Sequence, residues 1–196
     1  YFFVCPKIDK RTKKGAEQWA DIQDKHGHKQ IISEDSFSDI LAMSAAVLDN
    51  KTANGLITAA KYEKSIFWED PNTGVLCKCR PDILHSNMVC DLKTTVDASP
   101  HDFQRSVYNY GYHIQAAMMQ EGIYHATGKT IDDFIFIAIE KSPPYATAIY
   151  ILDKEAIEMG REDFKRTLKD YALCLKNDEW QSYQVKTISL PAYAYI

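Results

Sequence analysis

An uninterrupted apolar run at residues 134–139 constrains the fold of this chain more than any other feature. Its sequence is FIFIAI, which has no polar position and is typical of a central strand buried on both faces of a sheet. Such a strand requires helices on both sides of its sheet. Pro143 and Pro144 interrupt the pattern, and residues 146–152 predict a neighbouring strand.

Three further strands are predicted upstream of this run. Turn-forming residues fill 70–74, and a second break in the strand pattern lies at 85–87. The segments on either side of these breaks carry the residue types of strands. We therefore predict an antiparallel meander made of residues 65–69, 75–82 and 88–94.

Helices are expected before, between and after these strands. Ser33 can cap a helix within the helical segment 15–60. A long helix is expected to begin at Ser99 and end at Gly128, and the last helix is expected to follow Asp153. This order of elements predicts an α/β (α+β mixed) fold with a central mixed five-stranded sheet flanked by helices.

The length and charge of the chain limit what it can be. With 196 residues it is expected to form a single domain, in which a helical N-terminal part (1–60) precedes a core (61–180) and a tail (181–196). The net charge of -4 excludes a broadly basic surface, so any nucleic-acid site would have to be local. The basic stretch from Lys7 to Lys14 is expected to be either such a contact or a solvated end.

Other features of the sequence indicate a cytoplasmic protein without a membrane span. No run of 18 apolar residues is available to cross a bilayer. Five cysteines, an odd number, occur without a signal segment, which favours reduced thiols. The chain begins with Tyr1 rather than methionine, so we expect it to be part of a longer protein.

The candidate chemistry lies around one hairpin. Side chains alternate along a strand, so Asp91 and Lys93 face the same side of the segment 88–94. Asp82 ends the preceding predicted strand and can lie beside Asp91 across the turn. Two carboxylates prefer a hard cation such as Mg²⁺ or Mn²⁺, and an adjacent ammonium suits phosphodiester hydrolysis. A surface hairpin with a salt-bridged lysine is the alternative interpretation.

These residues resemble the motif of the PD-(D/E)XK nuclease superfamily. Pro81 and Asp82 match its first half, and Asp91, Leu92 and Lys93 match its second half. Over most of its length the chain is similar, more specifically, to the C-terminal nuclease domain of exonuclease VIII, the RecE-type exonucleases of phages and prophages. The closer resemblance is carried by residues 5–12, 63–68, 79–82 and 112–115.

The resemblance implies an exonuclease that uses Mg²⁺, for which Mn²⁺ can substitute, to degrade the 5′-ended strand of duplex DNA for recombination. It also implies a homotetrameric ring around double-stranded DNA ends and a single-strand annealing recombinase as a partner. The expected location is the cytoplasm, with a bacterial, phage or prophage origin. A PD-(D/E)XK endonuclease and a catalytically silent DNA-binding or scaffold domain remain the alternatives.

The resemblance further assigns roles to individual residues. Asp82 and Asp91 would be metal ligands together with the backbone carbonyl of Leu92, and Lys93 would be the catalytic lysine. Gln115 would contact the site or the DNA. The remaining candidates rest on their positions in the sequence. Glu63 is either a third carboxylate for the metal or an exposed acid at a strand end. Lys78 and Arg80 are either DNA contacts or ordinary charged strand positions, and Tyr112 is a further candidate DNA contact.

One feature of the related nucleases is not matched. Relatives often carry a histidine on an early helix near the metal, and the upstream histidines here are His26 and His28, whose surroundings predict a loop. We therefore expect the matching histidine to precede Tyr1. Near Gln115, a cluster of tyrosines is open to two interpretations, namely helix packing or stacking on a frayed base: Tyr108, Tyr110 and Tyr112.

Overall fold

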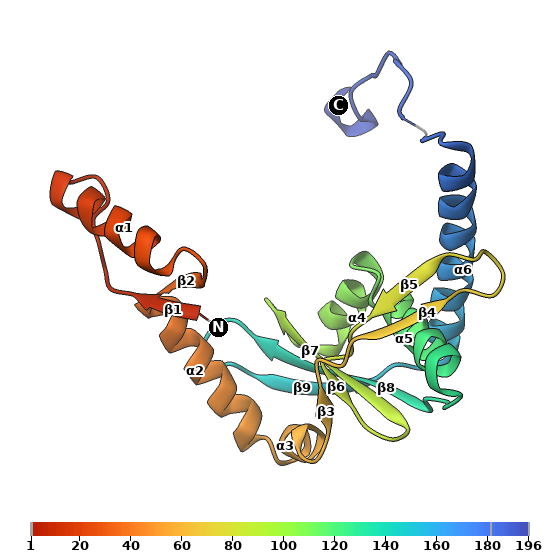
Figure 1. Ribbon diagram of the computed structural model, residues 1–196, viewed down its shortest axis with the longest axis horizontal. Helices are drawn as coiled ribbons and strands as arrows, with labels where there is room; N and C mark the ends of the chain where they lie inside the picture. Colours follow the sequence, from red (N-terminus) through yellow and green to blue (C-terminus); the bar gives the residue numbers. More distant parts are fainter. Residues whose placement is uncertain (1, 181, 196) are drawn as a thin grey trace.

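The computed structural model describes residues 2–180 and 182–195. Its centre is a five-stranded sheet with the strand order β3-β6-β7-β8-β9 (Figure 1). β7 and β8 run parallel, whereas the other neighbouring strands are antiparallel, so the predicted mixed five-stranded sheet is confirmed. The strands are β3 (Lys61–Tyr62), β6 (Ile83–Leu84), β7 (Met88–Thr95), β8 (Asp133–Glu140) and β9 (Thr147–Ile151).

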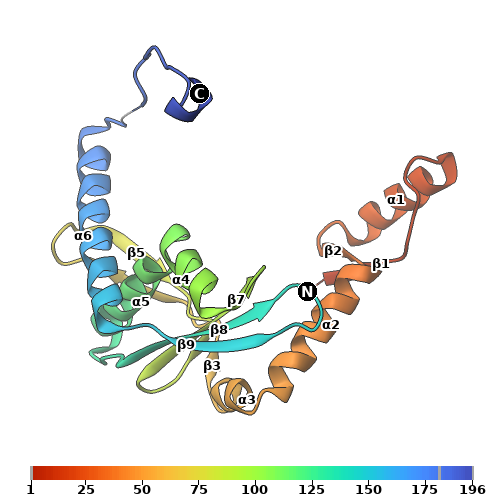
Figure 2. The ribbon, with the colours of Figure 1, turned by 180° about the vertical axis from the view of Figure 1, so that it is seen from behind.

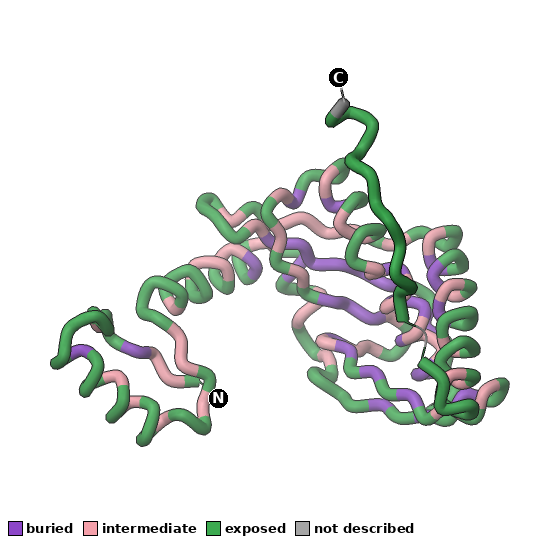
Figure 3. The backbone as a smooth tube through the Cα atoms, turned by 90° about the horizontal axis from the view of Figure 1, so that it is seen from above, coloured by how far each residue is buried: buried purple, intermediate pink, exposed green. Residues whose placement is uncertain are grey.

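The strand β8 separates two apolar layers. Phe134 and Phe136 belong to one buried cluster, and the alternate residues Ile135 and Ile137 belong to another. Figure 3 shows the buried residues concentrated along these strands, so a central strand buried on both faces is confirmed. The first layer is covered by α4 (Pro100–Asn109), α5 (Tyr112–Thr127) and α6 (Lys154–Asn177), and the second by α2 (Glu34–Asp49) and α3 (Lys51–Ile57).

The predicted three-strand meander is wrong. Within the described ranges, β4 (Ile66–Glu69) and β5 (Leu76–Cys79) pair only with each other and form a separate hairpin. This hairpin packs against α5, where Gly122 leaves room for the ring of Trp68. Pro81 has no backbone N–H to donate and separates β5 from β6. The short strand β6 therefore occupies the place beside β7 that residues 75–82 were expected to fill.

The long helix predicted from Ser99 to Gly128 is two helices in the structure. Tyr110 ends α4, and Gly111 turns the chain with a φ of +66° before α5 begins. Glycine suits this left-handed conformation because it has no Cβ. Gly128 ends α5 as predicted, but the side chain of Ser99 makes no capping hydrogen bond.

The first 60 residues are not wholly helical. The first half of this part is a parallel pair of strands joined by a helix, namely β1 (Phe2–Cys5), α1 (Lys13–His26) and β2 (Gln30–Ser33), and the helices α2 and α3 follow. Figures 1 and 2 show this unit standing away from the central sheet, to which α2 connects it. His26 ends α1 and its ring stacks on that of Phe3, so the loop predicted at this histidine is wrong, whereas His28 lies in the following turn.

Two predicted helix starts are confirmed. Ser33 caps α2 by accepting a hydrogen bond from the backbone N–H of Ser36, and Asp153 caps α6 in the same way through Ala156. None of the helices between residues 2 and 195, Gln181 aside, has the length and apolar content to cross a membrane.

The C-terminal tail follows α6. In Figure 2 it leads away from the sheet to a short 3₁₀ helix, Ala192–Tyr195. Gln181 and Ile196, which belong to the predicted tail, lie outside the described residues.

Candidate active site

The neighbouring strands β6 and β7 bring the two predicted aspartates together. Their antiparallel register pairs Ile83 with Cys90, so the next position places Asp82 opposite Asp91. Oδ2 of Asp82 accepts a hydrogen bond of 3.0 Å from the backbone N–H of Leu92. This bond fixes the side chain of Asp82 beside the strand that carries Asp91.

Asp91 lies in the layer between the sheet and α5, and its residue surface is only 1% exposed. Nε2 of Gln115, which is in α5, donates a hydrogen bond of 2.9 Å to Oδ1 of Asp91. Nζ of Lys93 lies 2.6 Å from Oδ2 of Asp91 and donates a hydrogen bond of 3.0 Å to Oε1 of Gln115. The three side chains therefore form a closed polar triangle within an apolar layer.

The carboxylate of Asp91 is unfavourable to ionise in this environment. Burial raises its pKa above the ordinary value, and the charge of Asp82 adds to the rise, whereas Lys93 and Gln115 oppose it. Oδ2 of Asp91 is buried, and no described group makes a well-directed hydrogen bond to it beyond the ion pair with Lys93. Two carboxylates face one ammonium here, so a cation beside the two aspartates would balance the second negative charge.

The donor set fits a hard divalent cation. Asp82 and Asp91 present carboxylate oxygens, and the Leu92 backbone is held next to both. Among the described residues, no group of three or more His, Cys, Asp or Glu side chains is placed to hold a metal ion. Mg²⁺ suits such a sparse site, because proteins commonly hold it with one or two carboxylates while waters and substrate phosphates complete its shell.

Glu63 does not join this pair of carboxylates as a free third ligand. Its Oε2 lies 2.8 Å from Nε of Arg80, and both side chains are more than half exposed. The backbone N–H of Glu63 donates a hydrogen bond of 3.2 Å to the carbonyl of Asp82. Glu63, the predicted metal ligand, and Arg80, a predicted DNA contact, thus form one ion pair beside Asp82.

Lys78, another predicted DNA contact, lies on the hairpin of β4 and β5. Its Nζ is 5.4 Å from the ring centroid of Phe67.

Tyr112 lies against the cluster of Asp91, Lys93 and Gln115. Nζ of Lys93 is 4.4 Å from the centroid of its ring. The ring also packs near Phe103 and Phe136, at centroid separations of 6.5 Å and 5.8 Å. Sequence reasoning missed the contact with Lys93 because it assumed one continuous helix. The isolated Gly111 inside the helical pattern was the signal that could have revealed it.

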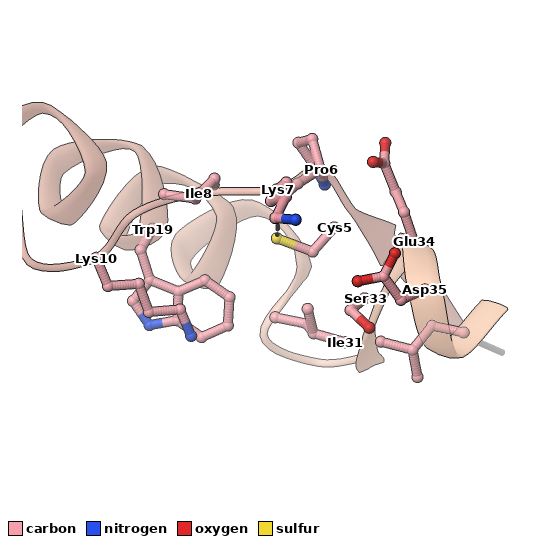
Figure 4. Close-up of a pocket in the computed structure, with 11 residues that line it drawn as sticks. Cys5, Pro6, Lys7, Ile8, Lys10, Trp19, Ile31, Ser33, Glu34 and Asp35 are labelled. Atoms are coloured by element: carbon pink, nitrogen blue, oxygen red, sulfur yellow. Dashed lines mark hydrogen bonds between the residues drawn. The ribbon is translucent and has the colours of Figure 1, made fainter. Parts of the chain in front are cut away.

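The basic stretch near the start of the chain lines a different pocket. This pocket, of about 270 Å³, lies against β1, β2 and the first turn of α2, where Lys7 and Lys10 share its walls with Glu34 and Asp35 (Figure 4). Nζ of Lys10 lies 3.1 Å from the ring centroid of Trp19. These lysines therefore lie among acidic and aromatic side chains, and the pocket shares no residue with the Asp91 cluster.

Comparison with known proteins gives a family and a fold. The profile of a family described as "PDDEXK-like domain of unknown function (DUF3799)" matches residues 4–188. Among solved structures, a candidate exonuclease of Eubacterium rectale is 16% identical with a TM-score of 0.63, and the alignment covers 92% of this chain and 73% of that one. At this identity the likeness shows the fold alone.

Two further structures are less similar. A phage-related exonuclease of Haemophilus somnus 129PT is 16% identical over 85% of this chain and 83% of that one, with a TM-score of 0.44. An alkaline exonuclease of Laribacter hongkongensis is 14% identical over 85% of this chain and 87% of that one, with a TM-score of 0.32. Neither score is high enough to carry an argument. None of the curated proteins matches the chain.

Proposed function

This chain belongs to the PDDEXK-like family, and we propose that it is a Mg²⁺-dependent exodeoxyribonuclease that degrades the 5′-ended strand from the ends of duplex DNA. The observation that carries the proposal is the cluster of Asp82, Asp91 and Lys93. A buried carboxylate that is paired only with Lys93 at one oxygen, a second carboxylate and an ammonium are groups suited to metal-assisted phosphodiester hydrolysis.

Each residue of the cluster has a role in the proposal. Asp82 and Asp91, together with the carbonyl of Leu92, would hold Mg²⁺, for which Mn²⁺ could substitute. When bound, such a cation polarises a phosphodiester and lowers the pKa of water. Lys93 holds an ammonium where negative charge develops on the phosphate, and Gln115 orients both Asp91 and Lys93 through its two hydrogen bonds.

The proposal extends to the DNA contacts. Arg80 lies in the segment between β5 and Asp82, and Lys78 lies on the neighbouring hairpin strand, so both are near enough in the chain to serve phosphates of the same duplex. A net charge of -4 gives a single chain a poor overall field for a polyanion. A homotetrameric ring that turns its local basic surface inward would overcome this, because DNA would be trapped topologically as well as electrostatically.

The wider setting is also part of the proposal. We expect the enzyme to act on double-stranded DNA ends in a bacterial, phage or prophage cytoplasm. The single strand that it leaves would be taken up by a single-strand annealing recombinase. Light scattering at low micromolar concentration tests the ring, for which about four times the monomer mass is expected; a persistent monomer would contradict it.

Digestion of end-labelled linear duplex in Mg²⁺ tests the activity and its polarity. We expect release of nucleotides from the 5′ end and no cutting of a covalently closed circular duplex. Cleavage of the circle would indicate an endonuclease. Binding of duplex without cleavage in Mg²⁺ or Mn²⁺ would indicate a silent DNA-binding domain.

Replacing Mg²⁺ by Ca²⁺ tests the role of the metal. Ca²⁺ has a larger and looser coordination shell, which can satisfy the carboxylates but positions water poorly. We expect Ca²⁺ to support binding of duplex DNA with little hydrolysis. Equal cleavage rates in the two ions would mean that the metal has only a structural role.

A further inference from the structure

We propose that the exposed ring of Tyr110 is a stacking platform for one nucleobase within the first three nucleotides from the phosphate that is cleaved. The inference rests on the proposed nuclease function and adds a substrate subsite to it. Tyr110 is 72% exposed and lies at the end of α4, where the ring of Tyr112 separates it from Lys93 of the candidate active site. An aromatic ring held in this position is suited to stack on a base of any sequence, since every base has a π-face.

A line of contacts connects Tyr110 to the catalytic cluster. The rings of Tyr110 and Tyr112 are stacked, with centroids 5.6 Å apart and an angle of 30° between their planes. The Tyr112 ring lies 4.4 Å from Nζ of Lys93, which is paired with Asp91. Successive bases along one strand are about 3.4 Å apart. Taken together, the two contacts place the Tyr110 ring within about three base steps of a phosphate held at Lys93.

The two tyrosines differ in what supports them. Tyr112 is partly buried and packs near Phe103 and Phe136, so its ring is fixed from behind. Tyr110 is fixed by that ring and by the turn at Gly111, which places the two tyrosines on either side of the corner between α4 and α5. This arrangement presents an oriented aromatic face to solvent without first having to order it on binding.

An open pocket lies in front of this pair. It has a volume of about 570 Å³ and is lined by both tyrosines and by Thr94 and Thr95, which follow Lys93 in β7. Its charged lining residues balance, because two cations face two carboxylates: Arg105, Lys141, Asp97 and Asp102. The pocket thus has room for a base but no excess of positive charge for a phosphate, which favours stacking over electrostatic binding.

The test is a cycle that combines a protein variant with a DNA lesion. The 196-residue chain is titrated in Ca²⁺ with a linear duplex that carries a single abasic site at the first, second or third nucleotide of either strand. At the position that stacks, we expect wild-type binding to weaken about five- to 150-fold, the range that base–aromatic stacking supports. Tyr110→Ala should weaken binding of the intact duplex by a similar factor. The abasic site should then cause no further loss of affinity in this variant.

Two further variants serve as controls. Tyr110→Phe keeps the ring and should bind like wild type. Tyr108→Ala removes a tyrosine of nearly equal exposure, 70%, whose ring stacks on His113 and lines a different pocket. It should bind like wild type and remain sensitive to the abasic site. Because stacking involves no counterion release, the Tyr110→Ala loss should also stay the same as salt is raised.

The outcomes separate this inference from the proposed function. The chain can bind and degrade linear duplex while the fold-losses of affinity from Tyr110→Ala and from each abasic site are independent and multiply. In that case the stacking subsite is wrong and the nuclease assignment stands. A Tyr108→Ala loss equal to that of Tyr110→Ala would also overturn it. If wild type neither binds nor degrades duplex in any divalent ion, the proposed function itself fails.

Discussion

The two faces of the central sheet are built from the same strands but contain different buried groups. The cluster beneath α2 and α3 is apolar and includes Cys90, Ile135 and Ile137. The opposite face is also rich in apolar side chains, but β7 inserts Asp91 into it one residue after Cys90. α5 adds Gln115 at the same level. Only one face of the sheet therefore departs from the pattern of a simple core.

The two faces also differ in their effect on stability, because the polar face, which carries Asp91, keeps a carboxylate buried. Burial raises the pKa of Asp91 above its value in an unfolded chain. An ionised carboxylate with a raised pKa lowers the free energy of unfolding at neutral pH, and this penalty disappears as the pH falls below the unfolded pKa. The apolar face has no such penalty. A buried carboxyl group whose pKa is raised by burial and by a second carboxylate is a candidate functional group.

The largest expected effect comes from removing the polar groups on the face of the sheet that carries Asp91, the polar face. Asp82→Asn, Asp91→Asn and Lys93→Ala should each lower the rate of cleavage about a thousandfold or more, because metal binding and charge stabilisation in the transition state are lost. Each variant should stay folded, as measured by circular dichroism and thermal unfolding. A folded variant that cleaves linear duplex at a near-normal rate would remove that residue from the mechanism.

A substitution on the apolar face should lower stability but leave the cleavage rate unchanged. Ile137 is fully buried there, so Ile137→Ala should lower the free energy of unfolding by about 2–5 kcal/mol, because it removes apolar contacts and leaves a cavity. Denaturant titration measures the loss. The cleavage rate per folded molecule should be unchanged well below the melting temperature. A fall in that rate as large as the Lys93→Ala loss would show that the two faces are not independent.

A smaller effect is expected from Gln115, which supports the other polar groups of the polar face. Gln115→Ala should lower cleavage about 10- to 100-fold, the usual cost of removing a group that orients a ligand or catalytic residue. Gln115 holds both Asp91 and Lys93, so the affinity for the divalent ion should fall with the rate. Isothermal titration with Mn²⁺ measures the affinity. Gln104→Ala, at an exposed position of α4, is the matched control and should leave both quantities unchanged.

Part of this structure could be predicted from the sequence, and part of it could not. The strand at 134–139 was predictable because six apolar residues leave no polar face, and Asp91 with Lys93 followed from strand alternation. The bond from Gln115 to Asp91 joins residues 24 positions apart and depends on how α5 crosses β7, which local patterns do not encode. The place of β6 beside β7 was missed because two residues are too short to give a strand signal.

Gly111 carries the smallest effect that we predict. Its φ is +66°, and the φ of Gly128 is +71°. A Cβ added at Gly111 would lie 3.6 Å from the nearest atom, and one added at Gly128 would have nothing within 4 Å. Alanine at either position should therefore lower the free energy of unfolding by about 1 kcal/mol, because the left-handed conformation is strained for a residue with a Cβ. Urea titration of both variants measures this common cost.

The two glycines differ in what they position, which makes them a matched pair. Gly111 sets the corner between Tyr110 and Tyr112, and thereby the ring against Lys93, whereas Gly128 ends α5 with nothing within 4 Å of an added Cβ. Gly111→Ala should therefore reduce cleavage, by less than Gln115→Ala does, and Gly128→Ala should not. Equal cleavage rates for the two variants at equal stability would mean that the corner at Gly111 only ends a helix and does not position the ring of Tyr112 against Lys93.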